Sequence, residues 1–286
     1  MEWWQSIVLG LVEGITEYLP VSSTGHLILA SSLLGLGRDE ASKSALDAFE
    51  VVVQGGAILA VLGLYAPRVR SLLLGLAGRD PAGLKLAVNL LLAFLPAAVL
   101  GLAIHEAIKT YLFNPPAVFT ALFVGGVWMI WLDRHRRKEK EGRSVNDLSP
   151  RDALWIGLMQ CASLWPGTSR SMMTISAGLL IGMRATEAAE FSFLLGLPTL
   201  SGACLYELAK NLHEASKHGT PNLFQELGVT ACILGVVVAT LSAVLAVRWL
   251  VSFLNRHGLA PFGWYRIALC IVMGVLIWVG WVQIVA

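Results

Sequence analysis

Two polar stretches interrupt otherwise apolar runs of the chain and carry the side chains that could do chemistry. Residues 13–26 read EGITEYLPVSSTGH, and residues 165–174 read WPGTSRSMMT. In both stretches a proline precedes small hydroxyl-bearing residues, and an apolar segment follows. Because ionisable groups are costly inside a membrane, their presence within apolar segments indicates a functional site.

Glu13 and Glu17 are spaced to act together. On a helix, residues four apart share one face, with Cβ atoms about 5–6 Å from each other. Two carboxylates this close in a low-dielectric environment need compensation, so either one is protonated or a cation neutralises the pair. A hard divalent ion such as Mg²⁺ takes oxygen ligands of this kind, so the pair is a candidate site for either a proton or such an ion. The alternative is a structural pair bonded to backbone amides where the helix breaks.

Small hydroxyl residues follow the proline in each stretch. Ser22 and Ser23 precede an apolar segment, and Ser169 and Ser171 do so in the second stretch. Capping of a helix would account for one or two of these hydroxyls. Backbone amides exposed at the start of a helix also form a site for anions. The two stretches are therefore candidate anion sites.

Arg170 and His26 add a cation and a titratable ring to these hydroxyls. The planar guanidinium of Arg170 suits bidentate binding of phosphate, and an ion pair with Glu13 or Glu17 is the alternative. A lone histidine is more often a packed core residue, but His26 stands among hydroxyls and carboxylates, where it could act as acid, base or nucleophile. Together these are the groups used in phosphoryl transfer: electrophilic clamps, a base, a nucleophile and a metal.

The composition places this site in a membrane. Of 286 residues, 56% are hydrophobic and 14% are charged, whereas roughly a quarter of residues are charged in soluble domains. Several apolar runs reach the roughly 20 residues that span a bilayer as helix. We expect an all-α polytopic membrane protein, surrounded by membrane lipid and without a nucleic-acid partner.

The apolar segments predict which helices position the site. Segments long enough to cross are found at 45–66, 86–108, 115–132, 188–209, 228–250 and 262–285. Segments too short to cross, which flank the two polar stretches, are found at 3–19, 27–36, 153–165 and 172–183. The more polar segment 67–85 is expected to be a loop, and Lys109 to Pro116 a tight turn between spans.

The chain is predicted to contain two homologous halves within a single membrane domain, 1–286. Residues agree at a constant offset of 146 in the pairs Pro20/Pro166, Ser23/Ser169, Arg38/Arg184 and Pro115/Pro261. The halves are residues 1–132 and 153–286, joined by the hydrophilic linker 133–152. Each holds a re-entrant helix pair plus three transmembrane helices, and an odd number of spans inverts one half relative to the other. Interrupted segments of inverted repeats point to a site near the midplane.

The basic residues predict the orientation. Most of the 21 Lys and Arg residues fall in the segments 67–85, 133–151 and 248–266, which share one side. Loops rich in Lys and Arg remain in the cytoplasm. We therefore expect a cytoplasmic linker and both termini on the periplasmic side.

The two polar stretches resemble the signature motifs of bacterial undecaprenyl pyrophosphate phosphatases of the bacitracin-resistance type. The resemblance extends over the whole chain and includes FEVVVQGGAILAV at 49–61 and EFSFLLGLP at 190–198. It implies an inner-membrane enzyme that removes the terminal phosphate of undecaprenyl pyrophosphate, a polyprenyl lipid, and so recycles the carrier of cell-wall precursors. It also implies a site open to the periplasm and dependence on a divalent cation, Mg²⁺ or Ca²⁺.

The family motifs fall on particular residues of this chain. The resemblance implies catalytic roles for Glu13, Glu17, Ser23, His26 and Arg170, with the two glutamates also binding the metal. It implies substrate binding by Ser22, Ser169, Ser171 and Thr174. The nucleophile stays open between the Ser23 hydroxyl and the His26 imidazole, either of which could attack phosphorus or activate water.

The chain departs from the family pattern at Met172, where the family usually has glycine; we expect activity to survive the change. Inverted repeats with broken helices are also a transporter architecture, so a flippase for polyprenyl phosphate is the alternative function. Glycines within spans, such as Gly125 and Gly126, permit close helix packing and leave a homodimer open.

Overall fold

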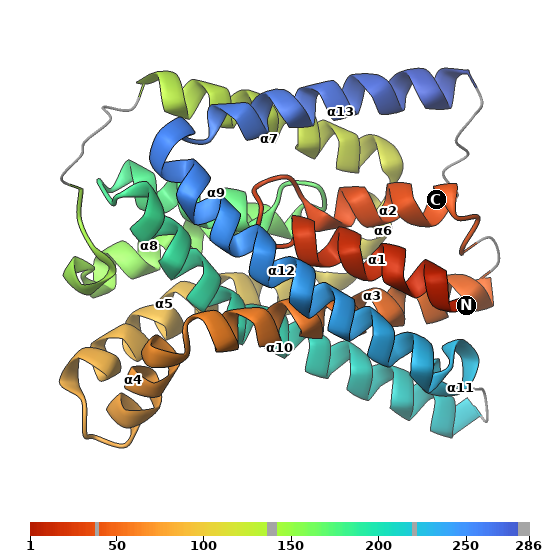
Figure 1. The fold of residues 1–286 in the computed structure, drawn as a ribbon, viewed down its shortest axis with the longest axis horizontal. Coiled ribbons are helices and arrows are strands. Elements are labelled where there is room, and N and C mark those ends of the chain that lie inside the picture. Colours follow the sequence, from red (N-terminus) through yellow and green to blue (C-terminus); the bar gives the residue numbers. More distant parts are fainter. Residues whose placement is uncertain (38–39, 136–141, 219–221, 280–286) are drawn as a thin grey trace.

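The computed structural model describes residues 1–37, 40–135, 142–218 and 222–279, and within these ranges the chain forms helices and no β-strand (Figure 1). In this part of the chain, six helices are long and apolar enough to cross a membrane. They are α3 (Glu40–Leu64), α5 (Pro81–Ala103), α7 (Pro115–His135), α10 (Ala185–His218), α12 (Val229–His257) and α13 (Ala260–Trp278). The prediction of a multi-pass α-helical membrane protein is confirmed.

One pair of short helices precedes α3, and a second pair precedes α10. They are α1 (Trp3–Thr16) with α2 (Ser23–Leu33), and α8 (Pro150–Gln160) with α9 (Arg170–Leu180). A short 3₁₀ turn, η2 (Cys161–Leu164), continues α8. Helices α2 and α9 begin earlier than their apolar segments, because serine caps start each helix within the polar stretch. The hydroxyl residues therefore lie at helix starts, as their types indicate.

Two predicted connections are wrong. The expected loop 67–85 contains α4 (Ala66–Leu76), which has a proline in its first turn, where the missing N–H costs nothing. The expected turn from Lys109 to Pro116 is largely helical, because α6 (His105–Leu112) covers its first four residues and α7 begins at Pro115. In both cases the polar residues belong to a short helix, and the sequence interpretation assigned them to a loop.

A third predicted connection, 248–266, is also wrong in its extent. Only residues 258–259 separate α12 from α13. Arg266 therefore lies within the first two turns of α13 rather than in a loop, and its side chain is fully buried. An arginine counted as a cytoplasmic loop residue is in fact an interior one.

The predicted linker begins and ends in helices. Helix α7 runs to His135 and α8 starts at Pro150, with the 3₁₀ turn η1 (Val145–Asp147) between them. Arg143 Nη2 donates to Asp152 Oδ2 at 2.6 Å, and this guanidinium holds the pKa of the Asp152 carboxyl well below its usual range. Residues 136–141 of the linker, and Arg38, lie outside the described residues.

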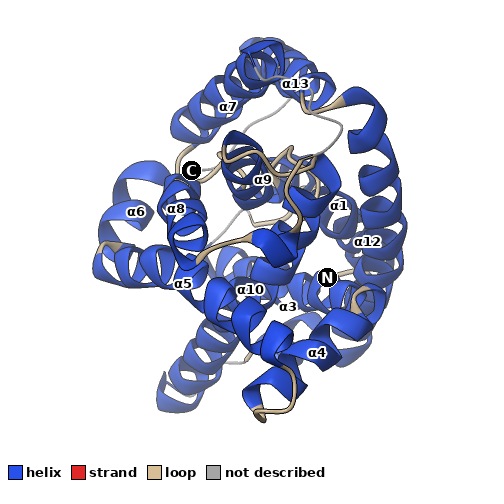
Figure 2. Ribbon diagram, turned by 90° about the vertical axis from the view of Figure 1, so that its left-hand side faces the viewer, coloured by secondary structure: helices blue, strands red, loops and turns tan. Residues whose placement is uncertain are grey.

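Helices from the two predicted halves pack against one another. Helix α1 packs along α12 and α8 along α5, while α7 pairs with α13 and α3 with α10 (Figure 2). The contact of α1 with α12 depends on glycines: a Cβ on Gly10 would lie 2.6 Å from the Gly235 carbonyl oxygen, and one on Gly14 would meet the Ala239 carbonyl and the Ser242 hydroxyl. Small residues let these backbones approach closely.

We expect Gly10→Ala to lower the free energy of unfolding by about 1–3 kcal/mol, because the added methyl group must push α1 away from α12. The measurement is the midpoint of thermal unfolding in detergent micelles. Gly55→Ala is the matched control, since a Cβ on that residue of α3 meets nothing within 4 Å. Equal midpoints for both variants would contradict the packing argument.

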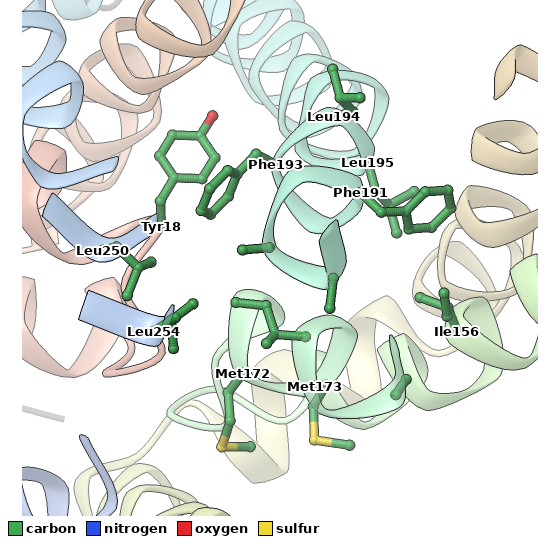
Figure 3. Packing of buried hydrophobic residues seen from close by; sticks show 14 of the residues in the cluster. Tyr18, Ile156, Met172, Met173, Phe191, Phe193, Leu194, Leu195, Leu250 and Leu254 are labelled. Carbon is green, nitrogen blue, oxygen red and sulfur yellow. The ribbon is translucent and has the colours of Figure 1, made fainter. Parts of the chain in front are cut away.

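The core surrounds the segment that follows α1. The ring of Tyr18 meets Phe193 of α10 edge-on, with centroids 5.3 Å apart and planes at 80° (Figure 3). Met172 and Met173 of α9 belong to the same buried cluster. Residues of α3, α9, α10 and α12 thus belong to the buried cluster that contains Tyr18, the residue after Glu17.

Candidate active site

The structure brings the two polar stretches together. Ser171 Oγ donates to the Leu19 carbonyl at 3.0 Å, and Arg170 Nη2 donates to Glu17 Oε1 at 3.0 Å. The residues of the turn after α1 and of the start of α9 are buried or half-buried. The prediction that the two stretches lie next to each other is confirmed by these two hydrogen bonds.

Two serines cap the second helix of each pair in the same unusual conformation. Ser22 has φ 72° and Ser169 has φ 78°, and they are the non-glycine residues with positive φ in the described part of the chain. Each Oγ accepts from the amide three residues on, at 3.5 Å from Gly25 and 3.3 Å from Met172. Non-glycine residues in this region cost of order 1–3 kcal/mol and cluster at functional sites.

These caps bear on the predicted match of Ser23 with Ser169. Ser22 and Ser169 both have positive φ and both accept from the amide three residues on, whereas Ser23 is the first residue of α2. Helix starts at residues 23 and 170 correspond at an offset of 147, whereas α7 and α13 start 145 residues apart. These helix starts differ by one residue from the offset of 146 that the sequence pairs share.

Ser23, Glu17 and Arg170 form a hydrogen-bonded chain between the two stretches. Ser23 Oγ donates to Glu17 Oε2 at 2.7 Å, and Arg170 pairs with the other carboxylate oxygen. The side chains of Arg170 and Glu17 are only 9% and 6% exposed. The ion pair that the sequence offered as an alternative role for Arg170 is therefore present, and Ser23 is linked to it through the carboxylate.

Helix α10 completes the surroundings of Arg170. Arg170 Nη1 donates to the Ser192 carbonyl at 2.7 Å, and Thr174 Oγ1 lies 2.6 Å from Ser192 Oγ. A Cβ on Gly196 would lie 3.0 Å from Arg170 Nη2, so a side chain at that position would crowd the guanidinium. Sequence reasoning missed Ser192 and Gly196, although both stand in the segment 190–198 that supported the family resemblance.

Glu13 is fully buried, and neither of its side-chain oxygens has a hydrogen-bond partner among the described residues. It lies one helical turn before Glu17, whose amide donates to the Glu13 carbonyl at 2.9 Å. A buried carboxylate without a donor requires a proton or a cation. No group of three or more His, Cys, Asp or Glu side chains is gathered for a metal in the described ranges, so a cation here would depend on few protein ligands.

Both ring nitrogens of His26 are engaged. Nδ1 lies 2.7 Å from the Ser22 carbonyl oxygen, and Nε2 lies 2.7 Å from the hydroxyl of Tyr265 on α13. The ring of His26 lies one turn beyond Ser23 on α2. Sequence reasoning did not single out Tyr265, and nothing in its local pattern connects it with a histidine more than 200 residues earlier.

Arg266 follows Tyr265 on α13 and binds carbonyls of both polar turns, the one before α2 and the one before α9. It is 0% exposed, and its guanidinium donates to main-chain oxygens rather than to a carboxylate. These acceptors are the carbonyls of Pro20, Ala121, Leu122, Gly167 and Thr168, at 2.6–3.4 Å. Its Nη1 also lies 3.2 Å from Met172 Sδ. The signal that could have identified it was a charge inside the apolar segment 262–285.

Gly125 and three polar residues outside the two stretches, Glu50, Gln54 and Glu190, have other partners. Gly125 faces Arg266, since a Cβ there would lie 2.6 Å from Nη2. Ser31 donates to Glu50 at 3.4 Å, and the Cys204 thiol lies 3.7 Å from Gln54 Oε1. Glu190 pairs with Arg68 at 2.7 Å and does not join the chain at Arg170.

Comparison with known proteins gives a consistent result over nearly the whole chain. Residues 6–272 match the family described as bacitracin resistance protein BacA. A protein of Rhodospirillum rubrum named undecaprenyl-diphosphatase 2 is 48% identical over 279 residues, covering 98% of this chain and 96% of its own. A protein of Sorangium cellulosum named undecaprenyl-diphosphatase is 46% identical, covering 94% and 84%. Another of that name, from Azotobacter vinelandii, is 45% identical, covering 98% and 96%.

Proposed function

The chain belongs to the bacitracin resistance protein BacA family, and on that basis we propose that it is an undecaprenyl-diphosphatase of the bacterial membrane. The reaction hydrolyses undecaprenyl pyrophosphate to undecaprenyl phosphate and inorganic phosphate. The observation that carries the proposal within this chain is the buried Ser23–Glu17–Arg170 chain, which joins a hydroxyl, a carboxylate and a guanidinium at the meeting of two helix starts.

Ser23 is the nucleophile in this proposal. A hydroxyl attacks only when a neighbouring base takes its proton, and Ser23 Oγ already donates to Glu17 Oε2 at 2.7 Å. Glu17 takes that proton as Oγ bonds to the terminal phosphorus, and the bond from phosphorus to the bridging oxygen breaks. Undecaprenyl phosphate leaves with that oxygen, and the phosphoserine is then hydrolysed by water.

His26 serves the second half of the reaction. The Ser22 carbonyl can only accept a hydrogen bond, so Nδ1 carries a proton and the basic lone pair of the neutral ring is on Nε2. That lone pair accepts a hydrogen bond from the Tyr265 hydroxyl, so a proton from the water that attacks the phosphoserine reaches Nε2 through this hydroxyl. The structure thus favours Ser23 over His26 as the attacking group, a choice that the sequence left open.

The phosphate-binding groups come from the start of α9. Arg170 Nε is buried without a partner in the described part of the chain, which leaves a donor for a phosphate oxygen. Ser169 and Ser171 lie with their hydroxyl oxygens 3.0 Å apart at this helix start, and Thr174 holds the side facing α10. Backbone amides at the N-terminus of α9, and those after Ser22 on α2, add further donors for an anion.

The carboxylates fit a divalent cation such as Mg²⁺ or Ca²⁺. Glu13 offers two buried oxygens without donors, and Mg²⁺ is commonly held by one or two carboxylates together with substrate phosphates. Glu13 and Glu17 would be the protein ligands. A bound cation would neutralise charge on the pyrophosphate.

We further propose that residues 1–132 and 153–286 are inverted repeats joined by the linker 133–152, with α1–α2 and α8–α9 as re-entrant pairs. The matching caps at Ser22 and Ser169 support this, as does the recurrence of a short pair before three long helices. Basic residues near the ends of α7 and α12 favour a cytoplasmic linker. Both termini and the site would then face the periplasm.

Phosphate release from undecaprenyl pyrophosphate in detergent micelles tests the function. We expect release by the wild-type protein with Mg²⁺, loss on chelation with EDTA, and recovery on adding Mg²⁺ back. Arg170→Ala should lower release by about 100-fold or more, because a preorganised donor to the transition state is lost. Arg256→Ala is a control, since that arginine is exposed at the end of α12.

A folded wild-type protein that binds the lipid but releases no phosphate would overturn the hydrolase. That outcome would restore the flippase, an alternative that the names of the relatives do not favour. Release that is indifferent to EDTA would instead remove only the cation from the proposal.

A further inference from the structure

We infer that Tyr265 links His26 to the water of the second step: its hydroxyl holds the Nε2 atom, fixes the imidazole beside Ser23 and passes a proton to it. The inference rests on the proposed hydrolase, in which Nε2 is the basic atom. It concerns a residue outside both polar stretches, on a helix that packs mainly on α7.

The contacts of the imidazole define its tautomer. The bond of Nδ1 to the Ser22 carbonyl, at 2.7 Å, requires a proton on Nδ1. The Tyr265 hydroxyl, 2.7 Å from Nε2, then donates to the remaining lone pair. The two rings are nearly parallel, with planes 6° apart and centroids 5.7 Å apart. A histidine held at both nitrogens keeps one tautomer and one orientation.

The position of Tyr265 is itself fixed by its neighbour. Arg266 is clamped by the carbonyls of Pro20, Gly167 and Thr168, which belong to the two polar turns. Two consecutive residues of α13 therefore contact the site: Arg266 binds its backbone carbonyls, and Tyr265 binds His26. Because Arg266 anchors α13 to both turns, the Tyr265 hydroxyl is placed relative to the reacting groups and not merely to α7.

The consequence is a division of roles along α2. Ser22 supplies the carbonyl that orients His26, and Ser23 supplies the attacking oxygen. Tyr265 completes the arrangement from α13: its hydroxyl oxygen takes a proton from the water as its own proton passes to Nε2. Acid–base catalysis requires each group to lie within hydrogen-bond reach of the proton that it transfers. A less firmly held imidazole should therefore slow turnover without weakening binding of the pyrophosphate.

Tyr265→Phe tests this, because it removes the hydroxyl and keeps the ring. We expect kcat to fall about tenfold with KM little changed. Carbethoxylation of His26 by diethyl pyrocarbonate, followed by mass spectrometry of the peptide, should become about fivefold faster, since a hydrogen bond worth about 1 kcal/mol no longer occupies Nε2. In a His26→Gln background, Tyr265→Phe should change kcat no further.

Tyr206→Phe is the matched control. Tyr206 also lies against a histidine, with its ring edge-on to His105 at 6.1 Å, and the Nε2 atom of His105 has no partner among the described residues. Reactivity of His105 should be the same in every variant and so reports on folding. Reactivity of His26 should change only when Tyr265 is replaced.

Unchanged reactivity of His26 in Tyr265→Phe would overturn the inference, and so would faster modification with an unaltered kcat. An equal loss of kcat in the His26→Gln background would also overturn it, because Tyr265 would then act independently of His26. Failure of the wild-type protein to release phosphate would overturn the proposed function instead. The two failures are distinguishable, since the reactivity of His26 is measured without turnover.

Discussion

The Ser23→Ala and Glu17→Gln variants are each expected to release phosphate about a thousandfold more slowly than the wild-type protein. Ser23 loses the attacking oxygen in the first, and Glu17 loses the ability to take its proton in the second. The 2.7 Å bond between them makes the two groups one unit. Initial rates at saturating undecaprenyl pyrophosphate, with Mg²⁺ present, give the comparison.

The double variant sharpens this test. Residues that act as a unit are strongly non-additive, so Ser23→Ala combined with Glu17→Gln should be no slower than either single variant. Ser32→Ala, at the other end of α2, is the control and should retain wild-type rates. Additive losses, or a Ser23→Ala enzyme within tenfold of wild type, would remove Ser23 as nucleophile and leave His26 as the attacking group.

The sequence predicts the long helices well because the membrane imposes their length. About 20 apolar residues must be contiguous to span the bilayer, and that requirement is visible in composition alone. The short pairs were visible for the same reason, since their apolar segments are interrupted by Pro20 and Pro166. Helices α4 and α6 have no such constraint, and their mixed composition is indistinguishable from that of a loop.

The convergence of the two polar stretches was predictable from energetics. Burying Glu13, Glu17 and Arg170 separately in an apolar environment would cost much free energy, so the sequence favoured one shared site. Their individual bonds were not predictable. The sequence left Arg170 open between phosphate and a carboxylate, and the structure shows that it pairs with Glu17 and the Ser192 carbonyl at once.

Residues that act through the backbone were missed. The partners of Arg266 are main-chain carbonyls, which every residue possesses and which no sequence pattern distinguishes. Tyr265 was missed because a single tyrosine in an apolar span is ordinary. The positive φ of Ser22 and Ser169 was not predictable for a similar reason, because it is decided by the tertiary contacts of each turn.

Arg266→Met is expected to lower the free energy of unfolding by about 3 kcal/mol or more and to abolish phosphate release. Methionine keeps much of the volume but donates no hydrogen bond, so the buried carbonyls of both turns lose their partner, and each orphaned group costs about 1–3 kcal/mol. Denaturant or thermal unfolding in detergent measures the first effect. Phosphate release at a temperature where the variant is folded measures the second.

Two comparisons separate the role of Arg266 from a general loss of charge. Arg256→Met removes an exposed arginine from the last turn of α12 and should leave stability and rate unchanged. Arg266→Lys keeps the charge, but a compact ammonium with three donors cannot replace a planar fork that reaches five carbonyls. Its stability should therefore lie between those of Arg266→Met and wild type. If Arg266→Lys were as active as wild type, charge alone would hold the turns, and the geometry of the clamp would carry no function.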